Sequence, residues 1–329
     1  MQFRTVLTPQ QAPADFKVDQ DNLILTIGSC FADEVGRRIK QRFFNIEVNP
    51  SGTLFNPLSI CVEINRALQG SVFTDDDVRL HPDGTKYISF SRHSKFSAPS
   101  AAELVARLNG QLKELAENLK QCNLLMLTLG SARCFKLKGS GEVVANCHKF
   151  PANDFEVVDL DVEEIETAMS QTITALLQLN PEMKIVLTVS PVRHIGYGLT
   201  ADRLSKSTLI VACHRLARQF SDSVIYFPAY EALTDDLRDY RFYADDMVHP
   251  SSVAADYVME LWASTFLSAS LQGQLNSWAK LYNNASNGSV SPLKIIAAAE
   301  RLNPTPLTLQ RVKKLCNTSQ NENSGLQNI

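Results

Sequence analysis

The chain has 329 residues, of which 44% are hydrophobic and 20% are charged, which is typical of a globular protein with a sizeable core. A formal net charge of −3 provides no basic surface, so we expect no nucleic-acid partner. No apolar signal core follows Met1 and no stretch is long and apolar enough to span a bilayer, so we expect a cytoplasmic protein without a membrane partner.

The cysteines and the lack of ligand clusters bear on redox state and cofactors. The seven cysteines are scattered without a framework spacing, which predicts reduced thiols. There is no Cys-x-x-Cys motif or His/Cys cluster, so we expect no metal and no other cofactor. The sequence does not define an oligomeric state.

Apolar strands alternate with amphipathic helices along most of the chain. Strands are expected at residues 23–27, 45–48, 124–129, 184–189 and 224–227. Helices are expected at residues 30–43, 58–68, 101–121, 162–179, 202–220, 251–270 and 292–301. Five short apolar strands that alternate with helices predict an α/β protein with a parallel sheet covered on both faces.

Two insertions and a polar end complete the predicted organisation. The turn signal Asp83-Gly84 and the alternating run 87–90 predict a small hairpin within residues 70–100. A second β-hairpin is expected where residues 135–138 and 142–145 flank a Gly-Ser-Gly turn. We expect one domain over residues 1–270, a helical extension over 271–316 and a disordered tail over 317–329, which is polar.

Polar or glycine-containing loops follow several predicted strands. The carboxyl ends of parallel strands form one edge of a sheet, and ligands bind beyond that edge. We therefore expect these loops to converge on one site. The loops are Gly28-Ser29-Cys30, Ser51-Gly52, Gly130-Ser131, Ser190-Pro191-Val192-Arg193-His194 and the segment before His249.

The first loop holds a hydroxyl and a thiol at the start of a helix, where backbone N–H groups and the helix dipole favour negative charge. Either Ser29 or Cys30 can serve there as a nucleophile whose attack produces an oxyanion. The alternatives are a serine N-cap and a small buried cysteine. Asp246 and His249, at i and i+3, suit an orienting carboxylate and a general base, or else a loop or capping pair.

Other residues can bind an oxyanion or a substrate. Gly52 and Gly130 allow backbone N–H groups to approach a reacting carbonyl, although each can equally just end an element. Asn56 offers a side-chain donor in the same loop as Gly52. Arg193 and His194 follow a strand end, and Arg193 suits an anionic substrate group or a surface salt bridge equally well.

The segment Gly28-Ser29-Cys30-Phe31-Ala32 resembles the name-giving motif of the GSCFA family, which belongs with the SGNH (GDSL-like) hydrolases. The resemblance covers roughly residues 20–265 and is nearest to the bacterial form, as in Bacteroidetes. It continues through residues 52–57, 128–130, 142–149, 190–194, 239–243 and 246–250.

This resemblance implies a flavodoxin-like three-layer α/β/α sandwich with a hydrolase site, in which Asp246 and His249 match the DxxH motif of the superfamily. An ungapped alignment with the Gly-Asp-Ser motif places Cys30 at the position of the nucleophile. The Gly-x-Asn-Asp motif is replaced by a segment without its Asn donor, residues 130–133, and Asn56 or Asn146 would supply that donor instead.

The expected function is hydrolysis of acyl esters through a covalent acyl-enzyme, with Ser29 or Cys30, His249 and Asp246 as the reacting groups. The resemblance implies a small-molecule or O-acylated carbohydrate substrate. One alternative is a thioesterase or acyltransferase that uses Cys30. The other is a non-catalytic ligand-binding or scaffolding module that keeps the hydrolase fold.

Overall fold

Five parallel strands form the central sheet. The computed structural model describes Leu7 and residues 12–325. The strands are β1 (Ile24–Gly28), β2 (Ile46–Val48), β5 (Leu124–Leu129), β9 (Lys184–Val189) and β10 (Val224–Phe227). Their order across the sheet is β10-β9-β5-β1-β2, which in chain order is the 2-1-3-4-5 arrangement of flavodoxin-like folds. The predicted five-stranded parallel sheet is confirmed.

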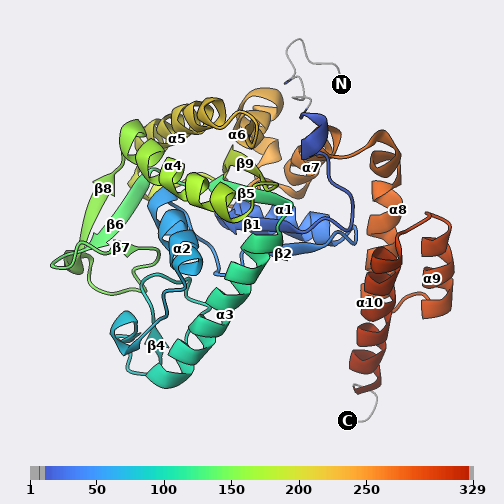
Figure 1. Cartoon of the computed structure of the whole chain (residues 1–329), viewed down its shortest axis with the longest axis horizontal. Helices are drawn as coiled ribbons and strands as arrows, with labels where there is room; N and C mark the ends of the chain where they lie inside the picture. Colours follow the sequence, from blue (N-terminus) through green and yellow to red (C-terminus); the bar gives the residue numbers. More distant parts are fainter. Residues whose placement is uncertain (1–6, 8–11, 326–329) are drawn as a thin grey trace.

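Helices cover both faces of this sheet (Figure 1). One face packs against α2 (Pro57–Gln69), α3 (Ala101–Gln121), α4 (Val162–Leu179) and α5 (Leu199–Gln219). The other face packs against α1 (Cys30–Lys40) and α7 (Ser252–Phe266), with the short α6 (Ala229–Glu231) beside them. The predicted three-layer sandwich is therefore confirmed.

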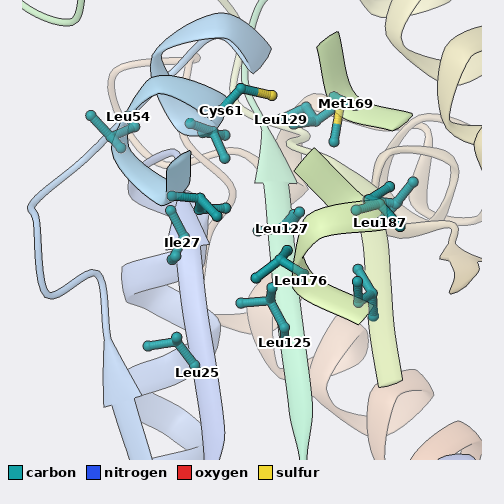
Figure 2. Close-up of a cluster of buried hydrophobic side chains, with 14 of the residues drawn as sticks. Leu25, Ile27, Leu54, Cys61, Leu125, Leu127, Leu129, Met169, Leu176 and Leu187 are labelled. Carbon is teal, nitrogen blue, oxygen red and sulfur yellow. The ribbon is translucent and has the colours of Figure 1, made fainter. Parts of the chain in front are cut away.

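The apolar strands form both cores because successive side chains of a strand point to opposite faces. Leu25 and Ile27 of β1 belong to the core under α2–α5, together with Leu125 and Leu127 of β5 (Figure 2). Ile24 belongs to the core under α1 and α7. A strand buried on both faces must be apolar at every position, which explains the continuous hydrophobic runs in the sequence.

Two small antiparallel sheets lie outside the sandwich. β3 (Arg79–Leu80) pairs with β4 (Tyr87–Ile88), and β6 (Arg133–Leu137) pairs with β7 (Val143–Val144), so both predicted hairpins are confirmed. The structure adds β8 (Phe155–Asp159), which pairs with the other side of β6 and was not predicted. Side chains of both insertions share one apolar cluster.

The expected single helix over residues 251–270 is wrong at its carboxyl end. α7 ends at Phe266, and α8 (Ala269–Ser286) starts a new direction. Leu267 is extended, with φ −109° and ψ 155°, and the Ser268 side chain accepts the Leu271 N–H at 3.3 Å. A serine N-cap therefore separates two helices where the apolar pattern runs through almost unbroken.

The carboxyl-terminal residues form two further helices, α9 (Pro292–Glu300) and α10 (Pro306–Gly325). The expected disordered tail over 317–329 differs from the structure at residues 317–325, which continue α10, while residues 326–329 lie outside the described part of the chain. Pro306 begins this helix, and no glycine or proline follows until Gly325, so nothing in the backbone interrupts it.

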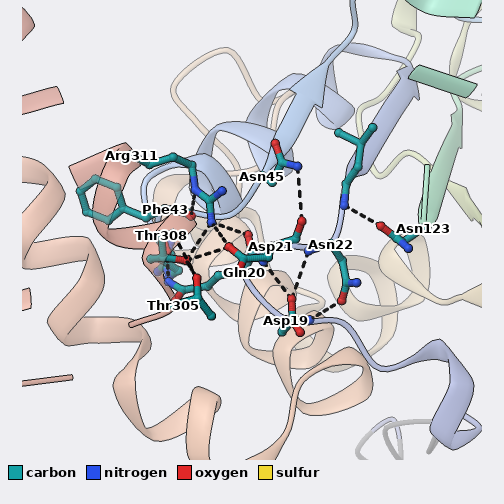
Figure 3. Close-up of polar contacts among 12 residues, drawn as sticks. Asp19, Gln20, Asp21, Asn22, Phe43, Asn45, Asn123, Thr305, Thr308 and Arg311 are labelled. Carbon is teal, nitrogen blue, oxygen red and sulfur yellow. Dashed lines mark hydrogen bonds and ion pairs between the residues drawn. The ribbon is translucent and has the colours of Figure 1, made fainter. Parts of the chain in front are cut away.

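The extension α8–α10 stands to one side of the sandwich and packs against the end of α1 (Figure 1). The centroid of the Phe43 ring lies 5.9 Å from the centroid of Trp278 and 5.4 Å from that of Tyr282. Figure 3 shows Arg311 of α10 donating to the Gln20 and Phe43 carbonyls and pairing with Asp21 at 2.6 Å. None of the described helices is long and apolar enough to cross a membrane.

Replacement of Gly28 by alanine is expected to lower the free energy of unfolding by about 2 kcal/mol or more. Gly28 has a φ of 151°, and an added Cβ would collide with the Thr128 backbone on β5. Gly110→Ala is the control, because Gly110 lies within α3 with nothing near an added Cβ; it should raise stability by about 0.5–1 kcal/mol. Urea denaturation measures both. Equal effects of the two substitutions would contradict this interpretation.

Candidate active site

The turn after β1 separates the roles of its hydroxyl and its thiol. Ser29 is 1% exposed and is the N-cap of α1, where its Oγ accepts the Phe31 N–H at 3.3 Å. Asn49, which follows β2, holds the turn from outside: its Oδ1 accepts the Gly28 N–H at 2.8 Å, and its Nδ2 donates to the Ser29 carbonyl at 3.3 Å. Ser29 therefore has a capping role in this structure.

Cys30, rather than Ser29, faces the distant imidazole. Its Sγ lies 3.7 Å from Nε2 of His249. The other ring nitrogen of His249, Nδ1, lies 2.7 Å from Oδ2 of Asp246. The structure thus places a thiol, an imidazole and a carboxylate in a row, the geometry in which a base takes a proton from a nucleophile while a carboxylate orients the base.

The segment that carries Asp246 and His249 is a loop, not a helical turn. Oδ1 of Asp246 accepts the N–H groups of Val248 and His249, each at 2.9 Å. Met247 between them has a φ of 58°, and the Ala244 N–H donates to the His249 carbonyl at 2.8 Å. Asp246 therefore fixes both the backbone and the ring of His249.

These hydrogen bonds determine the charge of Asp246. The His249 N–H and ring, with the Val248 N–H, lower the pKa of the Asp246 carboxyl to about 2. The carboxylate is therefore ionised at neutral pH. An ionised Asp246 keeps the proton of His249 on Nδ1, which leaves Nε2 free to accept the thiol proton.

The surroundings of Cys30 keep its thiol protonated. Burial raises the pKa of the thiol above its usual value, the nearby Asp33 carboxylate raises it further, and Lys206 opposes both effects. A protonated thiol needs a base at the moment of attack, and His249 is in contact with it.

The two predicted oxyanion glycines donate their N–H groups elsewhere. The Gly52 N–H donates to the Asn49 carbonyl at 2.8 Å, and the Gly130 N–H donates to the Phe55 carbonyl at 2.7 Å. Gly130 nevertheless borders the site, because a Cβ added there would lie 3.3 Å from the Cβ of Ser29. Gly52 instead packs against His93 and Phe96, and the amides of both glycines are already engaged.

The two asparagines suggested as replacement donors have local roles. Asn56 is the N-cap of α2: its Oδ1 accepts the Ser59 N–H at 2.8 Å, and its Nδ2 donates to the Ser59 hydroxyl at 2.9 Å. Asn146 lies in the insertion after β7, where its Oδ1 accepts the His148 N–H at 2.8 Å and its own N–H donates to the Phe90 carbonyl at 3.1 Å. None of these hydrogen bonds involves Cys30.

Arg193 supports the loop of His249, and within the described part of the chain its guanidinium forms no ion pair with an acid. Its guanidinium lies 4.0 Å from the centroid of the Tyr243 ring and 5.1 Å from that of Tyr240. Its backbone N–H donates to the Val248 carbonyl at 3.2 Å. Arg193 therefore joins the end of β9 to the residue next to His249.

His194 lies closer to the reacting groups. A Cβ on Gly130 would lie 3.4 Å from its Nε2. The imidazole stands edge-on to Phe55 and is stacked on Tyr197, with centroids 5.6 Å and 6.2 Å away. Burial, with Lys206 nearby, lowers the pKa of His194 to about 4, so its ring is neutral at pH 7. A neutral imidazole at this position can donate a hydrogen bond without competing with His249 as a base.

Three residues of the site were missed from the sequence. Asn49 and Asp33 hold the turn, since Nδ2 of Asn49 donates to Oδ1 of Asp33 at 2.9 Å. Lys206 of α5 is fully buried beneath Gly130 and donates to its carbonyl at 2.5 Å. The only available signal for Lys206 was the placement of a lysine on the apolar side of a helix, one turn after an aspartate.

In any reaction that this row of side chains catalyses, replacement of Asp246 by asparagine is expected to lower kcat by about a hundredfold or more, because the amide no longer fixes the tautomer of His249. The lowered pKa also has a consequence for stability. The Asp246 carboxylate contributes stability above about pH 4, and this contribution is lost as the pH falls towards 2. Kinetics at pH 7 and acid unfolding of both proteins test this. Equal kcat values for the wild type and Asp246→Asn, or identical unfolding curves at acid pH, would contradict these expectations.

The strand order defines a flavodoxin-like α/β protein, and the loops at the carboxyl edge of its sheet bring the Cys30 thiol, the His249 imidazole and the Asp246 carboxylate into contact. The model of the GSCFA family matches residues 23–262. The chain therefore belongs to the GSCFA family, and the resemblance found in the sequence is confirmed. Its bacterial origin and its compartment stay predictions.

Solved structures with significant similarity include three esterases, each with a TM-score of 0.32 and 79% of this chain covered. A carbohydrate esterase family 3 protein from Talaromyces cellulolyticus is 11% identical over 98% of its chain. An acetyl esterase variant with an acetate ion is 14% identical over 98% of its chain. An acetyl xylan esterase from the rumen bacterium Butyrivibrio proteoclasticus is 12% identical over 66% of its chain. No curated protein sequence matches this chain significantly.

Proposed function

We propose that this protein is an acyl hydrolase in which Cys30 is the nucleophile, His249 the general base and acid, and Asp246 the orienting carboxylate. The contact of the Cys30 thiol with Nε2 of His249, whose Nδ1 is held by Asp246, carries this proposal. The DxxH match of Asp246 and His249, in a chain of the GSCFA family, also supports it.

The reaction follows from these contacts. Nε2 of His249 takes the Cys30 proton as Sγ attacks the acyl carbon, and the tetrahedral intermediate then expels the leaving alcohol, which receives that proton. The acyl group is now a thioester on Cys30. A water molecule, deprotonated by His249, attacks this thioester, and the carboxylic acid leaves as the Cys30 thiol is protonated again.

The oxyanion needs donors other than those expected from the sequence. Cys30 is the first residue of α1, and the first amides of a helix have no acceptor within it. We assign the Cys30 N–H and the dipole of α1 to the oxyanion, as both lie at the nucleophile itself. The neutral imidazole of His194, beside Gly130, takes the place of the missing Asn donor.

An acyl group on a larger molecule is the substrate that fits best. The side chains of His249 and Asp246 are 51% and 49% exposed, so the base and its orienting carboxylate lie at the surface, next to the partly buried thiol of Cys30. An O-acylated carbohydrate, the class implied by the superfamily, can reach such a site. A thioesterase or acyltransferase is the second candidate, because a thiol nucleophile exchanges readily with thioesters.

Trapping of the acyl-enzyme tests the proposal. The protein is mixed with p-nitrophenyl acetate or a short acyl thioester, quenched in acid and mapped by peptide mass spectrometry. We expect one acetyl group on Cys30, released by neutral hydroxylamine as thioesters are. Cys147→Ser is the matched control, because Cys147 is also only partly buried, and it should keep the adduct. An adduct on Ser29, or turnover without Cys30, would overturn the assignment, and no adduct or turnover with either acyl donor would favour the non-catalytic module.

A further inference from the structure

A buried ammonium group lies beneath two strand ends that border the site. Lys206 projects from α5 and is 0% exposed. Its Nζ donates to the Gly130 carbonyl at 2.5 Å and to the Ser190 carbonyl at 2.8 Å. These carbonyls directly follow β5 and β9, so one side chain joins two adjacent strands of the sheet at their carboxyl ends.

This arrangement is costly for packing alone. Removing an ammonium from water costs several kcal/mol, and a methionine of similar size would fill the space without that cost. Lys206 has one acidic neighbour, Asp202, whose Oδ1 accepts the His194 N–H at 3.0 Å. Burial lowers the pKa of Lys206 to about 8 while Asp202 opposes the shift, so the group remains mostly cationic at pH 7.

A short path leads from this cation to the nucleophile. The Gly130 peptide that it holds lies beside the turn of Ser29 and Cys30, since a Cβ added to Gly130 would lie 3.3 Å from the Cβ of Ser29. Only His249, from the loop before α7, is in contact with the thiol. Asp33 of α1 and Lys206 of α5 act on it through their charges, and His194 after β9 lies beside Gly130. Lys206 favours the thiolate, while Asp33 disfavours it.

We propose that Lys206 is a positioning residue of this site, whose buried positive charge stabilises the Cys30 thiolate and whose hydrogen bonds fix the Gly130 peptide beside it. No motif of the family resemblance includes this residue. The inference rests on the proposed role of Cys30, but it concerns the thiol itself and can be tested without any substrate.

The test is the pH dependence of Cys30 alkylation by iodoacetamide, measured on the Cys30 peptide by mass spectrometry. In Lys206→Met we expect the midpoint to rise by about one pH unit, so that labelling at pH 7 is roughly tenfold slower. Lys206→Arg, which keeps the charge, should restore most of the rate. A Lys206→Met profile that coincides with the wild type would overturn the proposal.

Lys184→Met is the matched control. Lys184 is a partly buried lysine at the opposite end of β9, where it donates to the Asp222 carbonyl at 2.8 Å, so its replacement should not move the alkylation profile. If Lys206→Met does not fold, Lys206→Gln removes the charge and keeps a donor for the carbonyls, and the same shift is expected. Near-ultraviolet circular dichroism establishes that each variant is folded.

The outcomes separate this inference from the proposed function. A shifted alkylation profile in a protein without acyl turnover would support the role of Lys206 and contradict the hydrolase. Acyl turnover with an unshifted alkylation profile would support the hydrolase and contradict the role of Lys206. A merely structural role of Lys206 would lower the unfolding temperature and leave the profile of the folded variant unchanged, which also overturns the inference.

Discussion

Cys30→Ala is expected to lower kcat for acyl-ester hydrolysis by at least about a thousandfold, because it removes the atom that forms the acyl-enzyme. Ser29→Ala should keep kcat within about tenfold, since its hydroxyl caps α1 and does not face His249. Loss of that cap should instead lower the free energy of unfolding by about 1 kcal/mol. Steady-state kinetics and urea denaturation of both variants measure these opposite patterns.

A third variant, Cys30→Ser, tests whether His249 acts on the side chain at position 30. It keeps a nucleophilic atom at the same position with a proton that is harder to remove. We expect it to retain slow turnover with the same dependence on His249, so that Cys30→Ser with His249→Ala falls to the level of Cys30→Ala. Loss of activity in Ser29→Ala with full activity in Cys30→Ala would show that the hydroxyl is the nucleophile and would overturn the assignment of Cys30.

The second large effect is expected at a buried ion pair behind the Gly52 loop. Arg92 forms an ion pair with Glu63 of α2, and their side chains are 0% and 3% exposed. Glu63 also accepts the Ser51 hydroxyl. Among the described residues, Nε and Nη2 of Arg92 have no hydrogen-bond partner, and the guanidinium lies 4.8 Å from the centroid of the Phe73 ring. Glu63 therefore supplies the counter-charge for a buried guanidinium.

Glu63→Gln is expected to lower the free energy of unfolding by about 3 kcal/mol or more, because it leaves the Arg92 charge buried without a counter-charge. The double variant Glu63→Leu with Arg92→Leu should lose much less than the sum of the two single variants. Glu117→Gln is the control, since its pair with Lys120 is exposed, and no measurable change is expected. Urea denaturation decides. Additive losses in the double variant would show that the pair is not coupled.

The sheet and most helices followed from hydrophobic periodicity. The bounds 101–121 for α3 and 124–129 for β5 agree with the structure, because both elements pack against one continuous core. Element ends were less predictable where one residue decides the backbone. α1 stops at Lys40 rather than at Phe43, whose φ is 61°, and Ser268 divides an apolar run. Such ends depend on local hydrogen bonds that periodicity does not register.

The site was predicted in part. The sequence brought the turn at Cys30 together with Asp246 and His249, but it left the choice between Ser29 and Cys30 open. That choice depends on the direction of the backbone at the turn, which decides which of the two side chains caps α1 and which one points towards His249. The sequence also did not reveal the hydrogen bonds that engage Asn56 and Gly130. Asn56 accepts the Ser59 N–H and the Gly130 N–H donates to the Phe55 carbonyl, and both partners are set by the packing of the loops.

The contact of Arg311 with Asp21 also orders events during synthesis of the chain. These residues are 290 positions apart, and Phe43 receives its cover from Trp278 and from α10. The carboxyl end of the helix that carries Cys30 is thus covered only after Trp278 and Arg311 have been made, long after the helix itself. A nascent chain that contains Asp246 and His249 but not yet Trp278 still exposes the Phe43 ring, and this aromatic surface is available to chaperones until α8 and α10 have been made.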